Sequence, residues 1–400
     1  EGFEPSIRFR IHTFQACSLS HSDTSPEGSH RAGARAEPLR AFPCRREGRT
    51  IMESKLGRKC SSAPRRPSLA PLSALCPSRQ EEIPAPRPPL MGPHPMPSLA
   101  SNAALWYIGV RIHFPNLEPL PVMTKPAPSR TLAEQADRHR LYEQSVQCPQ
   151  AEVDFIDRAY RELRCKSARR LREDFCGTAA LCCEWVRRRK TNQATGVDID
   201  AEVLDWGRAN NLARLAETQA RRVALHQGDV RTVETGAQDI VCAMNFSYWL
   251  LTERAGLLRY FRRVREALKP DGVFFLDAYG GYDAYRVTAE DRVIQGEDGP
   301  FTYVWDQALY DPISGRLVCH IHFNFADGSR LERAFSYDWR LWSLPEIREL
   351  LAEAGFGRVI CYWQGWDDKG EPDGIFVPVE EGEPEAGWIA YLTAEKAGSR

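Results

Sequence analysis

The pattern of apolar and polar positions changes once along the chain. Before about residue 130, the apolar residues follow neither the period of two typical of strands nor the period of 3.6 typical of helices. From Ala168 onward, short apolar runs alternate with longer amphipathic stretches. Leu257, Phe261, Val264 and Leu268, for example, recur at the spacing of one helix face. We therefore expect folded structure in the second part of the chain and assign none to the first.

The second part reads as strands alternating with helices. Such an order predicts an α/β fold with a parallel, doubly wound sheet. Sheets of this kind bind ligands beyond the carboxyl ends of their strands, so the residues after each strand are the candidates for chemistry. We expect strands at 169–175, 194–198, 223–227, 239–244 and 273–277, and helices at 178–189, 201–215, 257–268 and 344–354.

About sixty residues separate the fifth strand from the last helix. They predict an antiparallel β insertion, at about 287–342, because apolar runs are separated there by turn sequences. An insertion at the carboxyl edge of the sheet would overhang a reaction centre. The alternatives are that it packs against another subunit or only extends the fold. The expected strands are 301–310, 316–325 and 330–342.

Composition sets the first 130 residues apart. They hold 20 of the 28 prolines and 18 Lys and Arg against 10 Asp and Glu, which leaves the remainder at about −9 in a chain of net charge −1. Too few spaced apolar residues are present to offset the entropy of ordering this segment. We expect 1–122 to be a disordered or non-native leader before a domain at 123–400. A transit peptide or a basic nucleic-acid-binding tail is the alternative.

The twelve cysteines include no CxxC pair. Reduced thiols in a cytoplasmic protein are the simpler interpretation. No apolar run reaches the roughly 18 residues of a membrane span, so no membrane association is expected. His320 and His322 alternate on one expected strand, but no third ligand has a convincing spacing, and we expect no metal site.

Four strand ends carry candidate chemistry. Gly177 belongs to a small-residue turn that feeds a helix, where backbone N–H groups can approach a ligand closely or simply make a turn. Asp198 can accept hydrogen bonds from a ribose, since Asp200 is the better N-cap for the next helix. Asp229 can accept the amine of an adenine or belong to an ordinary Gly-Asp turn. Asn245 begins a polar and aromatic set after the fourth strand.

These residues, in this order, resemble class I S-adenosylmethionine-dependent methyltransferases over Tyr142 to Lys396. Glu173 takes the place of the acid in the first motif of that superfamily, and Gly177 that of its middle glycine. Phe175 and Ala179 replace the outer two glycines, so this EDFCGTA form resembles a subgroup. The resemblance implies a Rossmann-like fold, with a seven-stranded, mostly parallel sheet flanked by helices, a core at about 135–397 and S-adenosylmethionine as cofactor.

The resemblance also implies roles for particular residues. Asp198 is similar to the ribose-binding acid of the family, and Asp229 and Val230 to its adenine-contacting pair. Asn245 and Phe246 match the segment that flanks the methionine moiety and the acceptor. The expected cofactor-binding residues are Glu173, Asp174, Gly177, Asp198, Asp229, Val230, Asn245 and Phe246; the expected catalytic residues are Asn245, Tyr248 and Tyr142.

Three functions are compatible with this sequence. A small-molecule methyltransferase is favoured by the overhanging insertion and by the acidic body, which would repel phosphates. An RNA-directed methyltransferase is less favoured, because the residues after Asn245 lack the two prolines common in enzymes that methylate base amines. A non-catalytic cofactor-binding scaffold subunit is the third. A homo-oligomer is compatible with each of these.

The composition boundary yields one prediction about the natural protein. Met123 opens an ordinary N-terminal sequence, MTKPAPSRTLAEQ, so we expect the native start at or near it. Peptide mapping of the protein from its natural source should then find peptides only from Met123 onward. Peptides from upstream of Met123 would contradict the prediction.

Overall fold

A computed structural model describes residues 130–366, 372–396 and 398. The expected leader at 1–122 lies outside the described residues. None of the helices in the described part has the length and apolar character that crossing a bilayer requires.

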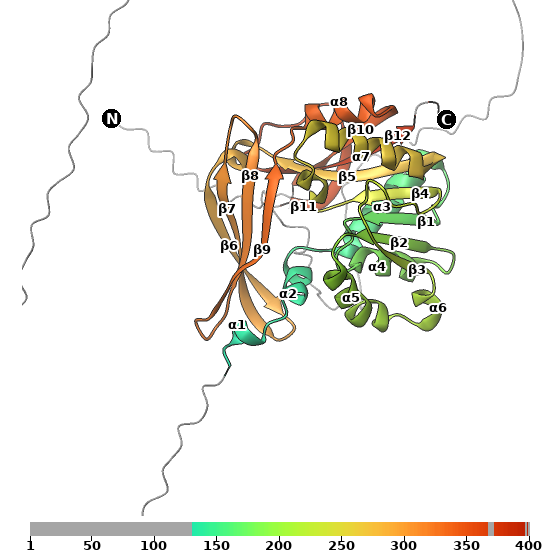
Figure 1. Cartoon of the computed structure of the whole chain (residues 1–400). Coiled ribbons are helices and arrows are strands. Elements are labelled where there is room, and N and C mark those ends of the chain that lie inside the picture. The colour runs from blue at the N-terminus through green and yellow to red at the C-terminus, as the bar shows by residue number, and fades with distance from the viewer. Residues whose placement is uncertain (1–129, 367–371, 397, 399–400) are drawn as a thin grey trace, which may run out of the picture. The chain divides into compact units, whose positions relative to one another are not determined.

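The main sheet has the strand order β11-β10-β12-β5-β4-β1-β2-β3. Neighbouring strands from β5 to β3 run parallel, and the pairs from β5 to β11 run antiparallel. The carboxyl ends of the parallel strands therefore meet at one edge (Figure 1). Their bounds are β1 Arg170–Asp174, β2 Gln193–Asp198, β3 Val223–Gln227, β4 Gln238–Ala243, β5 Leu268–Gly280, β10 Phe356–Trp366, β11 Pro372–Val379 and β12 Trp388–Lys396.

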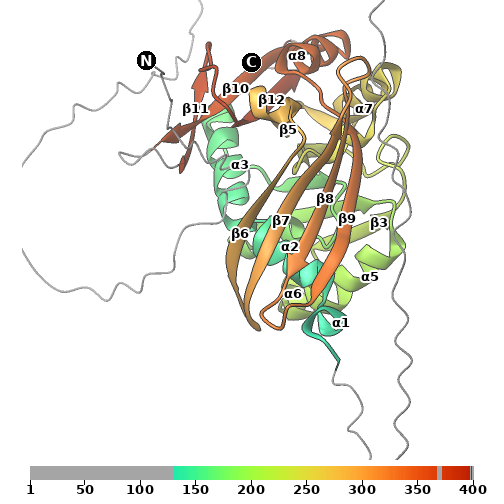
Figure 2. The same ribbon diagram turned by 90° about the vertical axis from the view of Figure 1, so that its left-hand side faces the viewer.

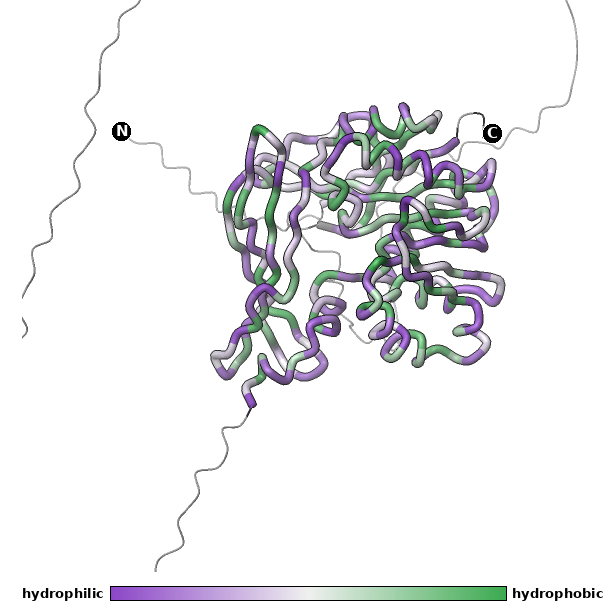
Figure 3. Tube along the Cα trace, in the orientation of Figure 1, coloured by the Kyte–Doolittle hydropathy of each residue, from purple (hydrophilic) through white to green (hydrophobic). Residues whose placement is uncertain are grey.

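Helices cover both faces of this sheet, whose strands β4 and β5 are largely buried; hydrophobic stretches are visible along the trace in Figure 3. Buried residues of α3, α4 and α5 form one core cluster with one face, and those of α7 and α8 form a second cluster with the other. The helices are α1 Leu132–Gln135, α2 Arg138–Ser145, α3 Pro149–Arg164, α4 Ala180–Arg188, α5 Ala201–Asn210, α6 Glu217–Ala220, α7 Arg254–Ala267 and α8 Leu344–Glu353, with short 3₁₀ turns η1 Leu212–Arg214, η2 Ser247–Leu250 and η3 Tyr282–Tyr285.

Local sequence explains where two of these helices begin. Asp200 caps α5 as expected, accepting hydrogen bonds from the backbone N–H groups of Glu202 and Val203. Ser343 and Glu346 form a reciprocal capping box at the start of α8. The helix expected to reach residue 215 ends instead at Asn210, and a 3₁₀ turn follows it. Asparagine favours such helix ends because its side chain competes for backbone hydrogen bonds.

The stretch of sequence between β5 and α8 forms a separate four-stranded antiparallel sheet, in the order β6-β7-β8-β9. Figure 2 shows its strands side by side. This sheet occupies the stretch where the insertion was expected but has four strands rather than three. The first of them was missed because three of its inward positions, Thr288, Glu290 and Arg292, are polar and hide the alternation. The strands are β6 Thr288–Gly296, β7 Gly299–Tyr310, β8 Arg316–Asn324 and β9 Arg330–Arg340.

The main sheet also differs from the expectation of seven strands, since it has eight in the described part of the chain. The additional edge strand is β11, which pairs with β10. Its sequence, PDGIFVPV, contains two prolines and a glycine, residues that weaken a strand signal and are tolerated at a sheet edge. The edge position therefore explains both the sequence and the missed strand.

A buried ion pair within β1 includes an arginine that also contacts the loop before β4. The Arg172 Nε atom lies 2.6 Å from Asp174 Oδ1, and both side chains are almost fully enclosed. The hydroxyl of Tyr260 on α7 donates to Asp174 Oδ2 over 2.9 Å. A second guanidinium nitrogen of Arg172 donates to the carbonyl oxygen of Val230 over 3.0 Å. Arg172 thus holds the chain that follows β3.

Removing one member of this pair should be costly. We expect Asp174→Ala to lower the free energy of unfolding by about 3–5 kcal/mol, because it leaves the Arg172 charge buried without its partner. Asp205→Ala is the control, since its partner Arg208 and Asp205 itself are 46% and 75% exposed, and such pairs contribute about 0–1 kcal/mol. Urea unfolding measures both. Equal losses in the two variants would contradict the assigned role.

Candidate active site

The loop between β1 and α4 lies at the carboxyl edge of the sheet. Phe175, Gly177 and Ala179 all have positive φ angles, of 58°, 50° and 59°. Phe175 and Ala179 are the two residues that replace glycines of the first motif. They keep the left-handed backbone that glycine would adopt freely, at a cost of about 1–2 kcal/mol each. The unusual sequence therefore retains a glycine-type loop.

Asp198, at the end of β2, braces this loop. Its Oδ2 atom accepts a hydrogen bond from the Gly177 N–H over 2.8 Å, and its Oδ1 atom accepts one from the Asp200 N–H over 3.0 Å. Each carboxylate oxygen has two lone pairs, so both retain capacity for a further donor. The carbonyl oxygen of Asp198 accepts from the Gly228 N–H over 2.8 Å, which brings the turn after β3 alongside.

Asp229 follows β3 and is engaged by Arg231. The guanidinium of Arg231 approaches both carboxylate oxygens, with an Nη2–Oδ2 distance of 2.6 Å and an Nε–Oδ1 distance of 2.9 Å. Its hydrogen bonds and charge hold the pKa of Asp229 below the usual value. The next residue, Val230, is buried. An adenine amine would have to share the Asp229 carboxylate with Arg231.

The segment after β4 is held by a residue that the sequence reasoning did not select. Asn245 and Phe246 both have positive φ, 58° and 55°. Their backbone N–H groups donate to the two oxygens of Asp277, over 2.7 and 2.9 Å. Asp277 lies in β5, and its burial raises its pKa to about 7 even though these two hydrogen bonds act in the opposite direction. The only sequence signal was an acid that ends an apolar strand.

Glu173 and Asp174 are occupied within the protein. Glu173 is buried and accepts a hydrogen bond from the Cys182 N–H over 3.1 Å, which joins β1 to the first turn of α4. Asp174 is paired with Arg172 and Tyr260, as described above. Glu173 therefore supports the start of α4 on one face of the sheet, and Asp174 lies in the core on the face covered by α7.

Three buried carboxyl groups lie close together on the α3 side of the sheet. Burial raises the pKa of Glu152 to about 8, and the charges of Glu173 and Asp277 add to the shift. Burial likewise raises the pKa of Glu173 to about 7. Such groups favour a bound proton or a nearby cation.

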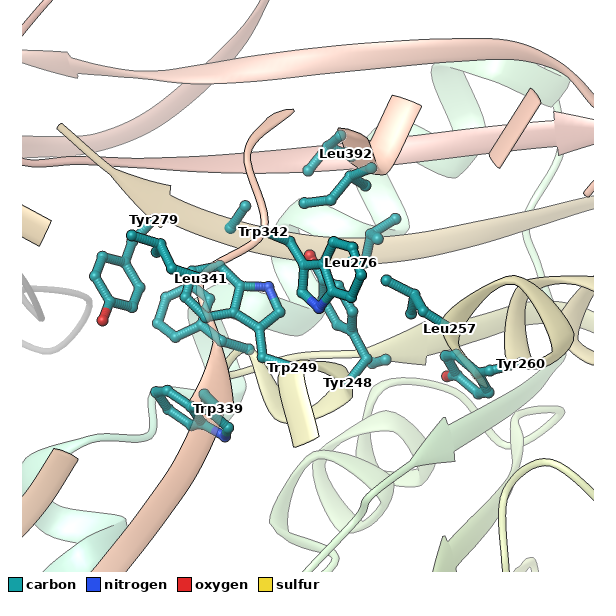
Figure 4. Packing of buried hydrophobic residues seen from close by; sticks show 14 of the residues in the cluster. Tyr248, Trp249, Leu257, Tyr260, Leu276, Tyr279, Trp339, Leu341, Trp342 and Leu392 are labelled. Carbon is teal, nitrogen blue, oxygen red and sulfur yellow. The ribbon is translucent and has the colours of Figure 1, made fainter. Parts of the chain in front are cut away.

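Tyr248, expected to be catalytic, is enclosed by the core. Its side chain is fully buried and its hydroxyl donates to the carbonyl oxygen of Asp277 over 2.7 Å. Figure 4 shows it among Trp249, Trp342 and Leu276. We attribute its polar and aromatic signal to the packing of η2 against β5. In this structure its hydroxyl joins η2 to β5 from within the core.

An aromatic group joins the main sheet to the antiparallel sheet. The Tyr279 ring lies 4.9 Å from the ring of Phe246 and 4.9 Å from that of Trp249, and Trp249 lies 5.8 Å from Trp339 on β9. Figure 4 shows Tyr279, Trp249 and Trp339 close together. Phe246 therefore contacts Tyr279 on β5, and its ring also lies next to that of Trp339 on β9. Tyr282, at the start of η3, is 59% exposed.

Tyr142 lies on α2, between the two sheets. Its ring is 4.9 Å from Phe335 on β9, and burial raises its pKa to about 12 despite a hydrogen bond with Tyr337. The neighbouring Glu143 accepts hydrogen bonds from Thr178 and Asn211 over 2.5 and 2.6 Å. The helix therefore connects the loop after β1 with the antiparallel sheet (Figure 1).

A match to a known protein family covers most of the residues described above. Residues 176–274 match the family model described as a methyltransferase domain. The matched stretch includes Gly177, Asp198, Asp229 and Asn245. The match agrees with the predicted methyltransferase class over these residues. No curated protein matches the chain significantly.

Similar solved structures include an S-adenosylmethionine-dependent methyltransferase from Clostridium acetobutylicum, with 17% identity, 65% of this chain and 98% of that chain covered, and a TM-score of 0.49. DesVI from Streptomyces venezuelae has 17% identity, 64% and 95% coverage and a TM-score of 0.48. The amino pentose methyltransferase CalS10 from Micromonospora echinaspora has 17% identity, 63% and 95% coverage and a TM-score of 0.46.

The buried carboxylates yield a prediction about pH. Glu152 keeps its proton up to about pH 8 when folded, whereas an unfolded glutamate loses it near pH 4.3. Stability should therefore fall as the pH rises through this window, because only the unfolded chain gains from ionisation. Glu152→Gln removes this cost, so its stability relative to wild type should increase from pH 5 to pH 8, by about 1.4 kcal/mol for each unit of pKa difference.

Chemical unfolding at pH 5, 6.5 and 8 measures this difference. Glu162→Gln on the same helix is the matched control, since Glu162 is exposed and its replacement should change stability equally at each pH. A stability difference between Glu152→Gln and wild type that does not vary with pH would contradict the prediction.

Proposed function

We propose that this protein transfers the methyl group of S-adenosylmethionine to a small-molecule acceptor by in-line displacement. The cofactor lies along the carboxyl ends of β1, β2, β3 and β4, and the acceptor lies between this edge and the β6–β9 sheet. The hydrogen bond between Gly177 and Asp198 carries the proposal, since it joins two of the expected cofactor residues in one preformed loop.

The donors and acceptors at this edge fit the cofactor. Asp198 has lone pairs left for ribose hydroxyls, and the turn with Asp229 and Val230 lies beside it for the adenine. Asn245 and Phe246 continue the same edge toward the methionine part. The cofactor carries a sulfonium and an ammonium charge, and the buried carboxylates of Glu152, Glu173 and Asp277 suit a cation.

The acceptor side is built for closure. Methyl transfer needs alignment and the exclusion of water more than strong acid–base chemistry. The antiparallel sheet contacts the loop after β4 through Trp339, and α2 contacts the same sheet through Tyr142. Aromatic faces there can also stabilise a sulfonium cation. We assign Asn245 and Tyr142 to the walls of the reaction centre.

A small acceptor agrees best with these features. The folded part of the chain carries about −9 in net charge, which would repel the phosphates of RNA. The match to a methyltransferase domain favours an enzyme over a scaffold. Neither alternative has a described contact that specifically supports it.

Asp198 provides the direct test. Asp198→Ala should weaken the binding of S-adenosylmethionine by roughly 1.5–3 kcal/mol, the range for hydrogen bonds to a charged group. Isothermal titration measures this loss. Asp200→Asn is the matched control, since asparagine also caps helices and the residue is two positions away on the same loop. Unchanged affinity in Asp198→Ala, or no binding by the wild type, would refute the proposal.

A further inference from the structure

A small cavity lies just beyond the end of β5, between η3, β6 and β7. Its walls come from Tyr279, Gly280, Asp283, Glu290, Trp305 and Gln307, among others. It has room for about one water-sized group. Such a space fits the end of an acceptor molecule and excludes a bulky ring.

The cavity adjoins the proposed reaction centre. Tyr279, one of its walls, has its ring 4.9 Å from that of Phe246, which follows β4. One side chain therefore separates the cavity from the loop that Asp277 holds. An acceptor anchored in the cavity can extend from there toward the transferred methyl group.

The polar groups of the cavity differ in what they already bind. Gln307 donates to the carbonyl oxygens of Asp283 and Arg286, each over 3.1 Å, and accepts from the Tyr279 hydroxyl over 3.4 Å. Asp283 forms an ion pair with Arg286 over 2.9 Å. The side chain of Glu290 forms no hydrogen bond or ion pair with another residue of the described ranges.

Glu290 is thus the charge that the cavity offers to a ligand. It lies directly across from Trp305 in the pairing of β6 with β7. Burial, with the charge of Asp283 added, raises the pKa of Glu290 to about 7. A cation close to the carboxylate would offset this cost of burial.

We propose that this cavity binds the alkylammonium group of an amine-containing acceptor, with Glu290 as its counter-ion and Trp305 as an aromatic wall. A carboxylate beside an aromatic ring suits an ammonium ion, because both attract positive charge. A phosphate or carboxylate group would be repelled. The identification of this ligand as the acceptor rests on the proposed methyl transfer, whereas the binding of the ammonium group does not.

Fluorine NMR of the full chain labelled with 5-fluorotryptophan tests the binding. The chain has ten tryptophans, so Trp305→Phe assigns the Trp305 resonance. Propylammonium chloride is the probe, 1-propanol its neutral counterpart and sodium chloride the ionic-strength control, all at pH 8. We expect a saturable shift of the Trp305 signal with propylammonium alone. Glu290→Gln should weaken this binding by about tenfold or more, the effect of losing a charge-assisted contact.

Asp291→Asn is the matched control, since Asp291 is the next residue on β6 and lies on its exposed face. It should bind propylammonium as wild type does. An equal shift with 1-propanol, unchanged binding in Glu290→Gln, or no saturable shift would each overturn the inference. Titration of the same samples with S-adenosylmethionine separates the two proposals. Cofactor binding without ammonium binding overturns only the ammonium site. Ammonium binding without cofactor binding overturns the proposed function and the identification of the ligand as the acceptor, and leaves the ammonium site standing.

Discussion

The geometry of the loop after β4 depends on one buried carboxylate, that of Asp277. Asn245 and Phe246 both adopt the left-handed backbone, which is unfavourable for side chains with a β-carbon. The two hydrogen bonds to Asp277 offset this cost and fix both N–H groups in one direction. Because Asp277 belongs to β5, the loop after β4 cannot move without that strand. The same residue's carbonyl oxygen holds the hydroxyl of Tyr248, so the core and the loop are positioned together.

Asp277 is also one of three buried carboxyl groups whose pKa values are raised. A carboxylate is costly to bury, and the fold places Glu152, Glu173 and Asp277 under the edge where the cofactor is expected. Their raised pKa values mean that the fold is less stable with these groups ionised. A cationic cofactor would relieve part of this cost, and a neutral product would relieve less. Stability of the fold and preference for the charged form of the cofactor therefore have a common cause.

Strands β4 and β5 of the central sheet could be predicted most directly, because each contains a continuous apolar run. The positions of Gly177 and Asp198 followed from the same logic, since the ends of parallel strands lie at one edge. The strand β6 could not be predicted, because its inward face is polar. Those polar residues include Glu290, which is why this strand carries the acidic wall of the cavity.

Side-chain direction was the other limit of the sequence. Glu173 and Asp174 are adjacent in β1, so their side chains point to opposite faces of the sheet. One braces α4, and the other pairs with Arg172 under α7. The face to which each side chain points is shown only by its partners, which include Cys182 on α4 and Tyr260 on α7.

The helix α2 and the antiparallel sheet form one side of the site by a shared set of contacts. Asp137 accepts a hydrogen bond from Trp206 on α5 over 2.6 Å, and Glu143 accepts from Thr178 beside the first loop. On its other side, Tyr142 packs on Phe335 of β9. The helix α2 therefore connects the loop between β1 and α4 with the antiparallel sheet through side-chain contacts. These contacts join elements that are far apart in sequence. An acceptor bound beside α2 would be enclosed by elements that contact the loop between β1 and α4.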